Sequence, residues 1–534
     1  MNATMTPFRS ALPSQRNDSF AHLLRAEWTK FRTVRGWVIG LLVGALLIVG
    51  LGALTGANSQ CSFQPNGSTA PQACPAPPTG PGGEWVTDSF YFVRQPLAGD
   101  GSITTRVTSL TGLYSTHGGQ AAGQSPTAGM TPGVQPWGKA GLIIKASGTA
   151  GSAYAAIMVT GSHGVRMQWN YVNDTPGLAG KVSAASPRWL RLTRSGDVIR
   201  GYDSADGTHW TLVGTATLAG LPPVSQAGLF AATPGYTTIS TGLATASSTG
   251  GGALATGAFD HVALVGGWPA GSRWTGDAIG ANSIVSGSLP ASAQGFTQAD
   301  GRFTVSGSGD IAPAPSAGDT ATNTLAGVFV GLIAMAVIGV MFITAEYRRG
   351  LIRTTLTASP RRGRVLAAKA AVLAAVTFAA GLVAIVIVIP VGERLLRENG
   401  NPIYPASALT LVRIAVGTAA LLAVAAVLAL AVGALLRRSA AAVTAVIAGI
   451  VLPYLLATLP GVLPVGAEQW LTRITPAAGF AIQQSTPAYP QVYASYTPGT
   501  GYFPLAPWAG FAVLCAWAAA ALALAVFVLR RRDV

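Results

Sequence analysis

The sequence predicts a membrane protein with six apolar helices and a β-sandwich inserted between the first helix and the second. Three observations predict this fold class. Half of the 534 residues are hydrophobic and only 10% are charged, whereas about a quarter of the residues of a soluble protein are charged. Six apolar runs are each long enough for a bilayer helix of about 20 residues. Between the first two runs, short alternating segments broken by Gly, Pro and Asp predict antiparallel strands.

The net charge of +15 lies almost entirely in short segments that flank the apolar runs. Residues 57–323 contain 12 basic and 12 acidic residues and have no net charge. A net positive charge is carried by each of the segments 1–36, 346–369, 437–438 and 530–533. Basic residues flank membrane helices mainly on the cytoplasmic side. The charge pattern therefore indicates membrane topology, with attraction to anionic membrane lipid as a secondary effect, and it argues against nucleic acid as a partner.

Residues 1–36 form the first unit, a polar cytoplasmic tail followed by an interfacial amphipathic helix. Aromatic and leucine side chains, Trp28 among them, recur at helical spacing, and basic residues lie opposite them. This arrangement is typical of a helix in the membrane interface. Glu27 falls inside the apolar stripe, where an unpaired carboxylate is costly. It either pairs with an arginine such as Arg348 or Arg349, or it extends to water.

Residues 37–55 are predicted to be transmembrane helix 1. Basic residues precede this run, so the N-terminus is expected inside, and the run is too long and begins too late for a cleaved signal peptide. Residues 56–83 follow as a linker rich in Pro and Gly. Cys61 and Cys74 lie close together in this linker and can pair if that side is oxidising. Two free thiols are the alternative.

Residues 84–266 are predicted to form an extracellular β-sandwich, because their short segments show no helical periodicity. Residues 267–323 are predicted to be an extracellular segment rich in Gly and Ser, with a few strand-like pieces. Within the sandwich, residues 133–139 match the spacing of a phosphate-binding loop up to its lysine. Ala140 replaces the Ser or Thr that such a loop requires, and neither a preceding strand nor a following helix is expected. We therefore assign no nucleotide site there.

Residues 324–534 are predicted to contain transmembrane helices 2–6. Alternation from an inside N-terminus places every basic cluster inside, every neutral segment outside and both termini inside. In the outer segment 460–507, residues 468–485 either dip into the membrane as a pair of short helices or lie at its surface. The five predicted helices cover residues 325–345, 365–390, 409–436, 440–459 and 508–529.

Residues 346–364 join the second and third predicted spans and form the densest basic run of the chain, with Glu346 as their single acid. A short basic segment between two spans belongs on the cytoplasmic side. Helix-forming residues precede Pro360, so the segment is expected to be structured. It is a candidate contact for a cytoplasmic partner.

The sequence carries no signature of catalysis. Its five histidines are scattered without the spacing of metal ligands, and no nucleophile or paired-histidine motif is present. We therefore expect no catalytic, cofactor-binding or metal-binding residue on this chain. Any ATP hydrolysis has to take place on another chain.

Five motifs of the outer segment follow one another in a familiar order. They are residues 139–145 (KAGLIIK), 187–194 (PRWLRLTR), 201–210 (GYDSADGTHW), 227–230 (AGLF) and 258–262 (AFDHV). Together they resemble the concanavalin A-like lectin/glucanase jelly roll, in the variety attached to many bacterial surface proteins. The motifs mark the fold and not a sugar site, and the paired acids of the glucanase branch are not evident.

Three motifs of the membrane part carry a second resemblance: residues 24–33 (LRAEWTKFRT), 346–355 (EYRRGLIRTT) and 360–369 (PRRGRVLAAK). They resemble the permease subunit of ATP-binding cassette (ABC) transporters, in the type-2 exporter class common in actinobacteria. The resemblance covers residues 20–55 and 325–534. The first outer loop of that family is usually short, whereas here it holds a whole domain.

The permease resemblance implies a role for the basic segment. In that family the loop after the second span is the coupling helix, which sits in a groove of the ATPase. The resemblance also implies an N-terminal interfacial helix and short re-entrant helices before the last span, which match residues 19–35 and 468–485. The residues expected to contact the ATPase are Glu346, Tyr347, Arg348, Arg349, Arg353, Arg361 and Arg362.

These observations predict a multi-pass ABC transporter permease of the cytoplasmic membrane. It is expected to export its substrate with energy from a separate cytoplasmic ATPase that holds the ATP, and to need a second permease half, as a homodimer or a paired permease. The alternative is a membrane-anchored receptor whose sandwich binds an extracellular glycan or protein. A surface glycosidase is a third hypothesis. An anchor needs one span, not six with a structured basic loop, so we favour transport.

Overall fold

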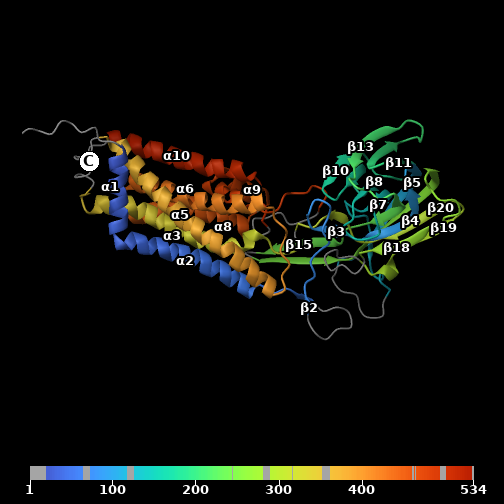
Figure 1. Ribbon diagram of the computed structural model, residues 1–534, viewed down its shortest axis with the longest axis horizontal. Coiled ribbons are helices and arrows are strands. Elements are labelled where there is room, and N and C mark those ends of the chain that lie inside the picture. Colours follow the sequence, from blue (N-terminus) through green and yellow to red (C-terminus); the bar gives the residue numbers. More distant parts are fainter. Residues whose placement is uncertain are drawn as a thin grey trace, which may run out of the picture.

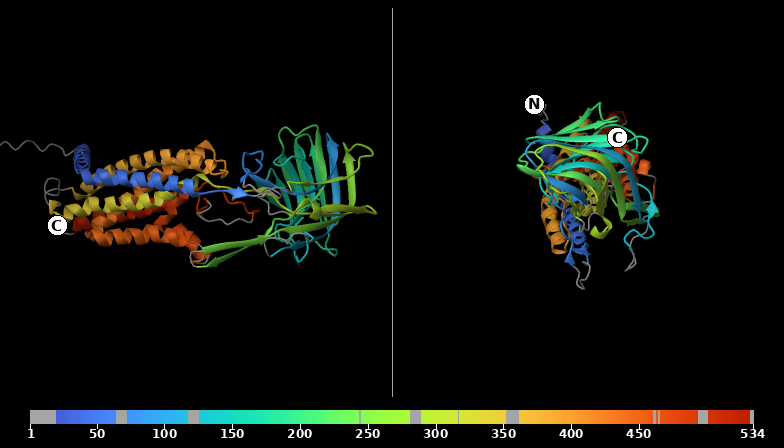
Figure 2. Two further views of the ribbon diagram at one scale, coloured as in Figure 1. Left: turned by 90° about the horizontal axis from the view of Figure 1, so that it is seen from below. Right: turned by 90° about the vertical axis from the view of Figure 1, so that its right-hand side faces the viewer.

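The computed structural model describes residues 20–63, 72–116, 125–242, 245–280, 289–315, 317–351, 361–459, 462–463, 465–492 and 501–531. A helical bundle and a β-rich region lie end to end (Figure 1). The chain starts in the bundle, builds the β region and returns to the bundle, as the colours in Figure 2 show. The helix α1 (Phe20–Thr33) and the C-terminal end of α10 (Pro507–Arg531) both lie at the end of the bundle away from the β region.

In the part of the chain that the structure describes, six helices are long and apolar enough to cross a membrane. This confirms the predicted apolar helical region with several spans. One of them is broken: α7 (Ser439–Val446) continues through a π-helical turn (Ile447–Val451) into α8 (Leu452–Thr458). The others are α2 (Arg35–Asn58), α3 (Ala326–Arg348), α5 (Arg362–Glu398), α6 (Ala408–Leu436) and α10.

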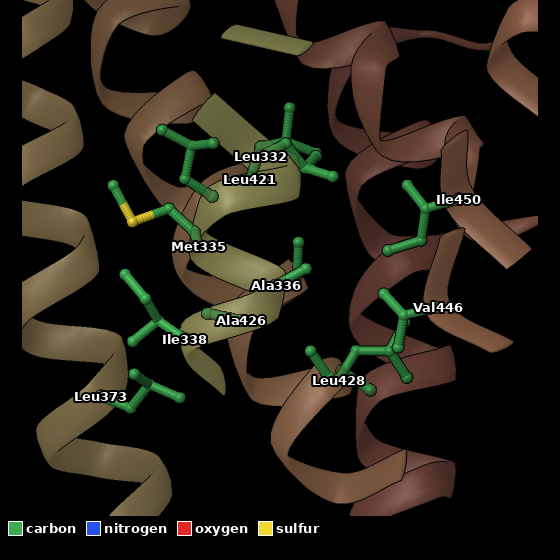
Figure 3. Packing of buried hydrophobic residues seen from close by; sticks show 14 of the residues in the cluster. Leu332, Met335, Ala336, Ile338, Leu373, Leu421, Ala426, Leu428, Val446 and Ile450 are labelled. Carbon is green, nitrogen blue, oxygen red and sulfur yellow. The ribbon is translucent and has the colours of Figure 1, made fainter. Parts of the chain in front are cut away.

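The centre of the bundle is formed by α3 and α6. In the most apolar stretch of each span, the buried share of the residues is 61% for the α3 span and 67% for α6. The same share is only 17% for α2 and 22% for α10. Figure 3 shows the apolar packing between α3 and α6, with Leu332, Met335 and Ala336 on α3 near Leu421 and Ala426 on α6. The helices α2 and α10 therefore leave most of their apolar surface exposed.

A stripe of small residues lets α2 approach its neighbours closely. Its buried residues are Gly44, Ile48, Gly52 and Gly56, four positions apart and so on one face. On the facing helix α3, a Cβ added to Gly327 would lie 2.9 Å from the Ile48 Cα and even closer to the Ile48 carbonyl oxygen. In a membrane, where the hydrophobic effect does not drive helices together, such close backbone packing stabilises association.

Gly327→Ala is expected to lower the free energy of unfolding by about 1–3 kcal/mol, the usual cost of overpacking. Gly50→Ala is the matched control, because an added Cβ there meets no atom within 4 Å. Both variants gain the same helix propensity, so denaturant titration in detergent isolates the steric effect. Equal stability of the two variants would contradict this packing.

The prediction of an all-β region is confirmed for residues 86–315. Two antiparallel sheets pack face to face and curve together (Figure 2). The first has the order β10-β9-β8-β7-β14-β4-β18 and the second β13-β12-β11-β5-β17-β20-β19, with β6 beside β5. The strands of the first sheet are β4 (Phe90–Ala98), β7 (Lys139–Lys145), β8 (Tyr154–Thr160), β9 (Val165–Trp169), β10 (Asn173–Pro176), β14 (Val224–Ala232) and β18 (Thr275–Ile279).

Three strands of the two sheets, β18, β19 and β20, come from the segment 267–323, for which only a few strand-like pieces were expected. The strands of the second sheet are β5 (Gly101–Tyr114), β6 (Thr131–Pro132), β11 (Arg188–Ser195), β12 (Val198–Ser204), β13 (Thr211–Thr217), β17 (Ala253–Gly266), β19 (Gly295–Ala299) and β20 (Arg302–Gly307). Separately, the hairpin of β15 (Tyr236–Gly242) and β16 (Thr245–Gly251) extends from the β region towards the bundle (Figures 1 and 2).

The outer face of the first sheet is covered by the chain itself. Two short paired strands, β3 (Val86–Asp88) and β21 (Ile311–Pro313), contribute apolar side chains to a second core on that face. Two lysines of β7 end in ion pairs beneath this cover: Lys145 Nζ lies 2.6 Å from Asp88 Oδ2, and Lys139 Nζ lies 2.6 Å from Asp310 Oδ1. Every residue of β7 and β8 is buried.

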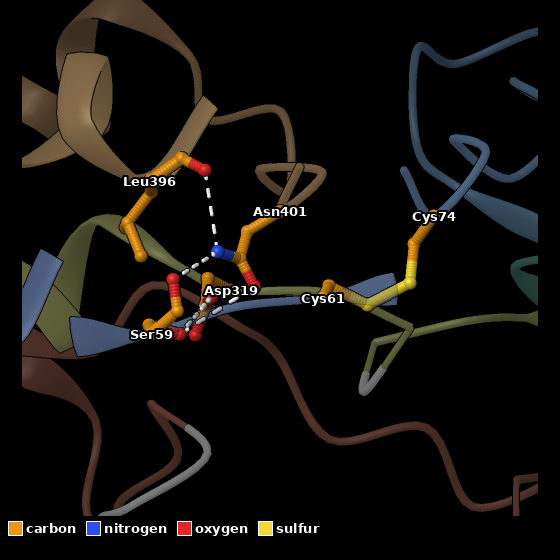
Figure 4. Close-up of a disulfide and its surroundings, with 6 residues drawn as sticks. All are labelled: Ser59, Cys61, Cys74, Asp319, Leu396 and Asn401. Atoms are coloured by element: carbon orange, nitrogen blue, oxygen red, sulfur yellow. Dashed lines mark hydrogen bonds between the residues drawn. A yellow bond between two sulfur atoms is a disulfide. The ribbon is translucent and has the colours of Figure 1, made fainter. Parts of the chain in front are cut away.

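The β region is fixed to the bundle by polar contacts near the ends of α2 and α5 that lie closest to the β region. Asn401 donates from Nδ2 to the carbonyl oxygens of Ser59 (2.8 Å) and Leu396 (3.2 Å). The backbone N–H of Asp319 donates to Pro402 O at 3.0 Å. Figure 4 shows these side chains beside a disulfide between Cys61 and Cys74. The short strands β1 (Ser62–Phe63) and β2 (Gln72–Ala73) pair next to that disulfide.

The segment before the last span forms two short helices. The first is α9 (Val465–Ile474), and the second is a 3-10 helix (Pro476–Gln483) whose eight residues are all buried. The 3-10 helix packs against α6 and α10. Further along, Gln491 donates from Nε2 to Tyr171 O at 3.1 Å, so this segment also touches the β region.

Candidate functional site

The helix α1 lies across the end of the bundle that carries the basic segments (Figure 1). Its buried residues are Glu27 and Phe31. Phe31 packs edge-on against Phe342 of α3, with ring centroids 5.9 Å apart. Trp28 is 46% exposed, which suits an aromatic side chain at a membrane interface.

Four charged side chains from α1, α3 and α5 form an alternating ring at this end. The ammonium group of Lys369 lies 2.6 Å from Glu27 Oε2 and 2.6 Å from Glu346 Oε1. The ammonium group of Lys30 lies 2.8 Å from Glu27 Oε1 and 3.3 Å from Glu346 Oε1. Each carboxylate therefore accepts from both lysines, and the ring has no net charge. We call these four residues the charge ring.

The charge ring is largely removed from water. The side chain of Lys369 is 1% exposed and that of Glu27 is 4% exposed, whereas Lys30 is 42% exposed. Lys369 Nζ also lies 4.7 Å from the centre of the Phe342 ring, a cation–π contact. Burial lowers the pKa of Lys30, but the hydrogen bond to Glu27 and the charges of Glu27 and Glu346 outweigh it, so the pKa is raised.

Both expectations for Glu27 were wrong. It does not extend to water, and its partners are Lys30 and Lys369 in place of Arg348 or Arg349. Arg348 and Arg349 come at the last turn of α3 and are exposed. Lys369 lies two turns inside α5, and its ammonium group lies against Glu27, on the buried face of α1.

Two further contacts join α6 and α10 to the helices of the charge ring. Arg437, which has a left-handed backbone (φ 56°) where α6 ends, stacks over the Tyr347 ring of α3 at 5.4 Å. Arg362 donates from Nη1 to Leu529 O at 2.7 Å and joins the start of α5 to the end of α10. Together with the charge ring, these contacts link α1, α3, α5, α6 and α10.

The structure places most of the residues expected to contact an ATPase around this end. Glu346 belongs to the charge ring, and Tyr347 and Arg362 hold neighbouring helices. Arg348, Arg349 and Arg361 are exposed. Arg353 lies outside the described residues.

Sequence reasoning missed Lys30, Lys369 and Arg437. The signal for Lys369 was present, because a lysine inside an apolar run predicted to span the membrane needs a partner. Lys30 follows Glu27 by three residues, a spacing that brings two side chains together on a helix. Arg437 was counted only as a topology signal.

No cluster of three or more His, Cys, Asp or Glu side chains that could hold a metal ion occurs within the described ranges. The polar groups gathered at the basic end are ion pairs and cation–π contacts. They can hold helices together and present positive charge.

A protein-family comparison identifies the class to which this bundle belongs. The model of the family described as ABC-2 family transporter protein matches residues 223–534, more than half of the chain. The chain therefore belongs to the ABC-2 transporter family and is a membrane permease subunit, not itself a catalyst. The match begins within the β region, just before β14, and runs through the later strands and the five spans that follow.

Comparisons with other proteins add no function. No curated protein matches the chain. Among solved structures, it is similar to a functionally unknown protein from Saccharomyces cerevisiae, at 17% identity and a TM-score of 0.23, over 40% of this chain and 95% of that one. It is also similar to SCP-B, an Eqolisin family peptidase solved with a tripeptide, at 5% identity and a TM-score of 0.24, over 42% of this chain and 100% of that one. A third similar structure is the GH43 protein BlXynB from Bacillus licheniformis, at 14% identity and a TM-score of 0.16, over 25% of this chain and 24% of that one. Similarities at such TM-scores carry no argument.

Proposed function

We propose that this permease subunit exports its substrate across the cytoplasmic membrane, driven by a separate cytoplasmic ATPase that acts on the basic end of the bundle. The observation that carries the proposal is the charge ring. It joins α1 to the ends of α3 and α5, between which the basic segment lies. A displacement of that segment would therefore be transmitted to all three helices.

The transmission of movement follows from the way the basic segment is connected to α3 and α5. The segment 349–361 leaves the end of α3 at Arg349 and enters α5 at Arg361. Glu346, one turn before the end of α3, and Lys369, two turns into α5, are joined directly by an ion pair of 2.6 Å. A partner that displaces the segment would therefore move α3 and α5 together, with α1 attached. Because α3 lies at the centre of the bundle, that movement would reach α6 as well.

The distribution of charge supports a cytoplasmic position for this end. Exposed arginines gather here, Arg348, Arg349 and Arg364 among them. At the opposite end of α5 the arginines are balanced by acids, with Arg394 paired to Glu398 at 2.8 Å. By the positive-inside rule, the basic end faces the cytoplasm and the β region lies outside the cell. The disulfide lies on the outer side, where thiols are oxidised.

Thiol mapping tests this topology. Protein extracted from cells, denatured and alkylated without reductant is expected to yield the Cys61 and Cys74 peptides joined to each other, with Cys515 alkylated. The physical reason is that a disulfide persists in an oxidising compartment and is reduced in the cytoplasm. Recovery of all three cysteines in alkylated form would place the β region inside.

A second permease half is part of the proposal. In the described part of the bundle, α3, α5 and α6 enclose an apolar cluster that includes Leu332, Leu373 and Leu422. A polar or amphipathic substrate finds no polar passage through such a core. The pathway would then lie between two bundles, either two copies of this chain or a pair of related permeases. The apolar outer surface of α2 and α10 would face this second half or membrane lipid.

The rival hypothesis of a glycan- or protein-binding receptor finds less support. The face of the first sheet that could receive a ligand is covered by β3 and β21, and the two lysines beneath are already paired with Asp88 and Asp310. We therefore propose that the β region is an accessory to transport.

A site-specific photo-cross-linker tests the contact with the ATPase. Placed at Leu351, which is 47% exposed after the end of α3, it is expected to capture a nucleotide-binding ATPase subunit in cell membranes. Placed at Leu212 of β13, which is 51% exposed, it serves as the matched control and is expected to capture none. Capture of the ATPase from Leu212, or from neither position, would refute the proposed contact.

A further inference from the structure

Arg413 carries a positive charge into the apolar bundle near the β region. It belongs to the second turn of α6, a helix long and apolar enough to cross a membrane. That end of α6 closely follows Ile403, which bridges to Asp319 where the bundle joins the β region. The guanidinium donates from Nη2 to the backbone oxygen of Gln484, just after the 3-10 helix. A charge at membrane depth is costly and marks a candidate functional site.

The charge of Arg413 is not balanced by an acid. Within the described residues Arg413 forms no ion pair, and no acid acts on its charge. The acids outside the described residues are Asp18 and Asp533, each two positions from Phe20 or Arg531 at the opposite end of the bundle. Two residues reach about 7 Å at most, whereas α6 alone is about 43 Å long. Neither acid can therefore reach Arg413.

The polar groups where α6 meets the 3-10 helix are also incompletely paired. Arg413 Nε and the side-chain amide nitrogen of Gln483 are buried and donate to no described atom, and the side-chain oxygen of Gln484 accepts from none. Buried polar groups are nearly always paired in proteins. Two of these three groups are donors and one donor belongs to a cation, so the ligand that complements them is an anion with oxygen acceptors.

Beside Arg413, α6 presents an exposed apolar strip. Leu409, Val412 and Val416 are 82%, 59% and 41% exposed. They are three and four residues apart, and Arg413 lies four residues after Leu409 and three before Val416, so all four share one face of the helix. The surface therefore combines one positive charge with an apolar strip, which is complementary to an amphiphile that has an acidic headgroup.

We propose that Arg413 binds the acidic headgroup of an amphipathic anion whose apolar tail lies along Leu409, Val412 and Val416. Guanidinium groups form strong charge-assisted hydrogen bonds with phosphate and carboxylate oxygens. The proposal deepens the proposed transport function and rests on it for the side of the membrane, which is the outer leaflet. Since the apolar cluster of α3, α5 and α6 offers no polar passage, an amphiphile would move along the surface of the bundle. The anion is a substrate or a resident lipid of the same chemistry.

Titration of the purified full-length protein in uncharged detergent tests the site. R413Q is expected to weaken the apparent affinity for lysophosphatidylglycerol about tenfold, because a hydrogen bond to a charged group is lost. Thermal unfolding midpoints and native mass spectrometry measure that affinity. Lysophosphatidylcholine, which has no net charge, should not distinguish R413Q from the wild type. R394Q is the matched control, since it removes an exposed arginine already paired with Glu398 near the β region, and it should bind like the wild type.

A photoreactive tail supplies a second measurement, which needs no variant. Lysophosphatidylglycerol with a diazirine in its acyl chain is expected to label residues 409–416 of the wild type, and an excess of the unmodified lipid should abolish the label. This result decides the question if R413Q does not fold. Equal affinity of the wild type and R413Q, labelling that excludes residues 409–416, or equal protection by inorganic phosphate alone would each overturn the proposal.

ATP hydrolysis by the complex with the ATPase distinguishes the two sources of the anion. Stimulation by lysophosphatidylglycerol in the wild type but not in R413Q would identify a substrate, and binding without stimulation would identify a resident lipid; both results support the site. The titration itself contains no ATPase. Its failure would therefore refute the Arg413 site and leave the coupling function standing.

Discussion

Lys369→Met is expected to lower the free energy of unfolding of the purified protein by about 3–5 kcal/mol, the usual cost of breaking a buried ion pair by removing one partner. The substitution leaves Glu27 (4% exposed) facing Glu346 (12% exposed) with only the outer lysine between them. Two carboxylates in a poorly hydrated site repel each other. The loss should appear as a lower midpoint in denaturant titration in detergent.

Lys30→Met is the matched control. Lys30 contacts the same two carboxylates, but its side chain is 42% exposed, and exposed ion pairs contribute about 0–1 kcal/mol. The double variant E27Q/K369Q, which removes one charge of each sign, should recover part of the loss because no carboxylate is then left without its partner. If Lys369→Met and Lys30→Met had equal effects, the charge ring would not hold α1, α3 and α5 together.

Asp88→Ala, in the β region, is expected to lower the free energy of unfolding by a similar amount, about 3–5 kcal/mol. Asp88 Oδ2 accepts from Lys145 Nζ at 2.6 Å, from the Tyr171 hydroxyl at 2.8 Å and from the Gly151 N–H at 2.8 Å. The side chains of both Asp88 and Lys145 are fully buried. Asp277→Ala removes a carboxylate that is 51% exposed and paired with Arg94, and it should cost about 1 kcal/mol or less.

The cost of Asp88→Ala should depend on pH. Burial already lowers the pKa of Lys145 below its ordinary 10.5, against the opposing charge of Asp88, and removal of Asp88 lowers it further. Between the folded-state pKa and 10.5 the unfolded chain binds more protons than the folded one, so stability rises with pH in that window. The wild-type Lys145 does the same at a higher pH, so the stability deficit of the variant in denaturant titrations should shrink only between the folded-state pKa of Lys145 in the variant and that in the wild type, and stay constant above it. A deficit independent of pH would contradict the burial of a charged Lys145.

The spans and the β region were predictable because each depends on a local pattern. Apolar runs such as residues 409–436 are unbroken, and β8 and β11 read as short segments between turns. The late strands β18–β20 were harder, because they are short and β19 has no buried residue. β18 pairs with β4, which lies far away in the sequence, and β20 pairs with β17 across the segment that contains β18 and β19.

The candidate site could be predicted only in part. The basic segment and the membrane interface of α1 follow from charge and periodicity. The pairing of Glu27 with Lys369 spans 342 residues, and it depends on how α1 crosses the end of the bundle, which no local pattern encodes. The cover over the first sheet was equally hidden, because β3 and β21 contribute three residues each and pair only through tertiary packing.

ATP hydrolysis by the affinity-purified complex tests the central claim most directly. The tagged chain is expected to co-purify with an ATPase whose hydrolysis rate falls about thirtyfold in R348Q/R349Q, because both arginines are exposed where the basic segment begins and the loss of two interfacial contacts of about 1 kcal/mol each is of this size. The control R394Q/R397Q should retain the wild-type rate. Purification without any ATPase, or equal rates in the two double variants, would contradict the account.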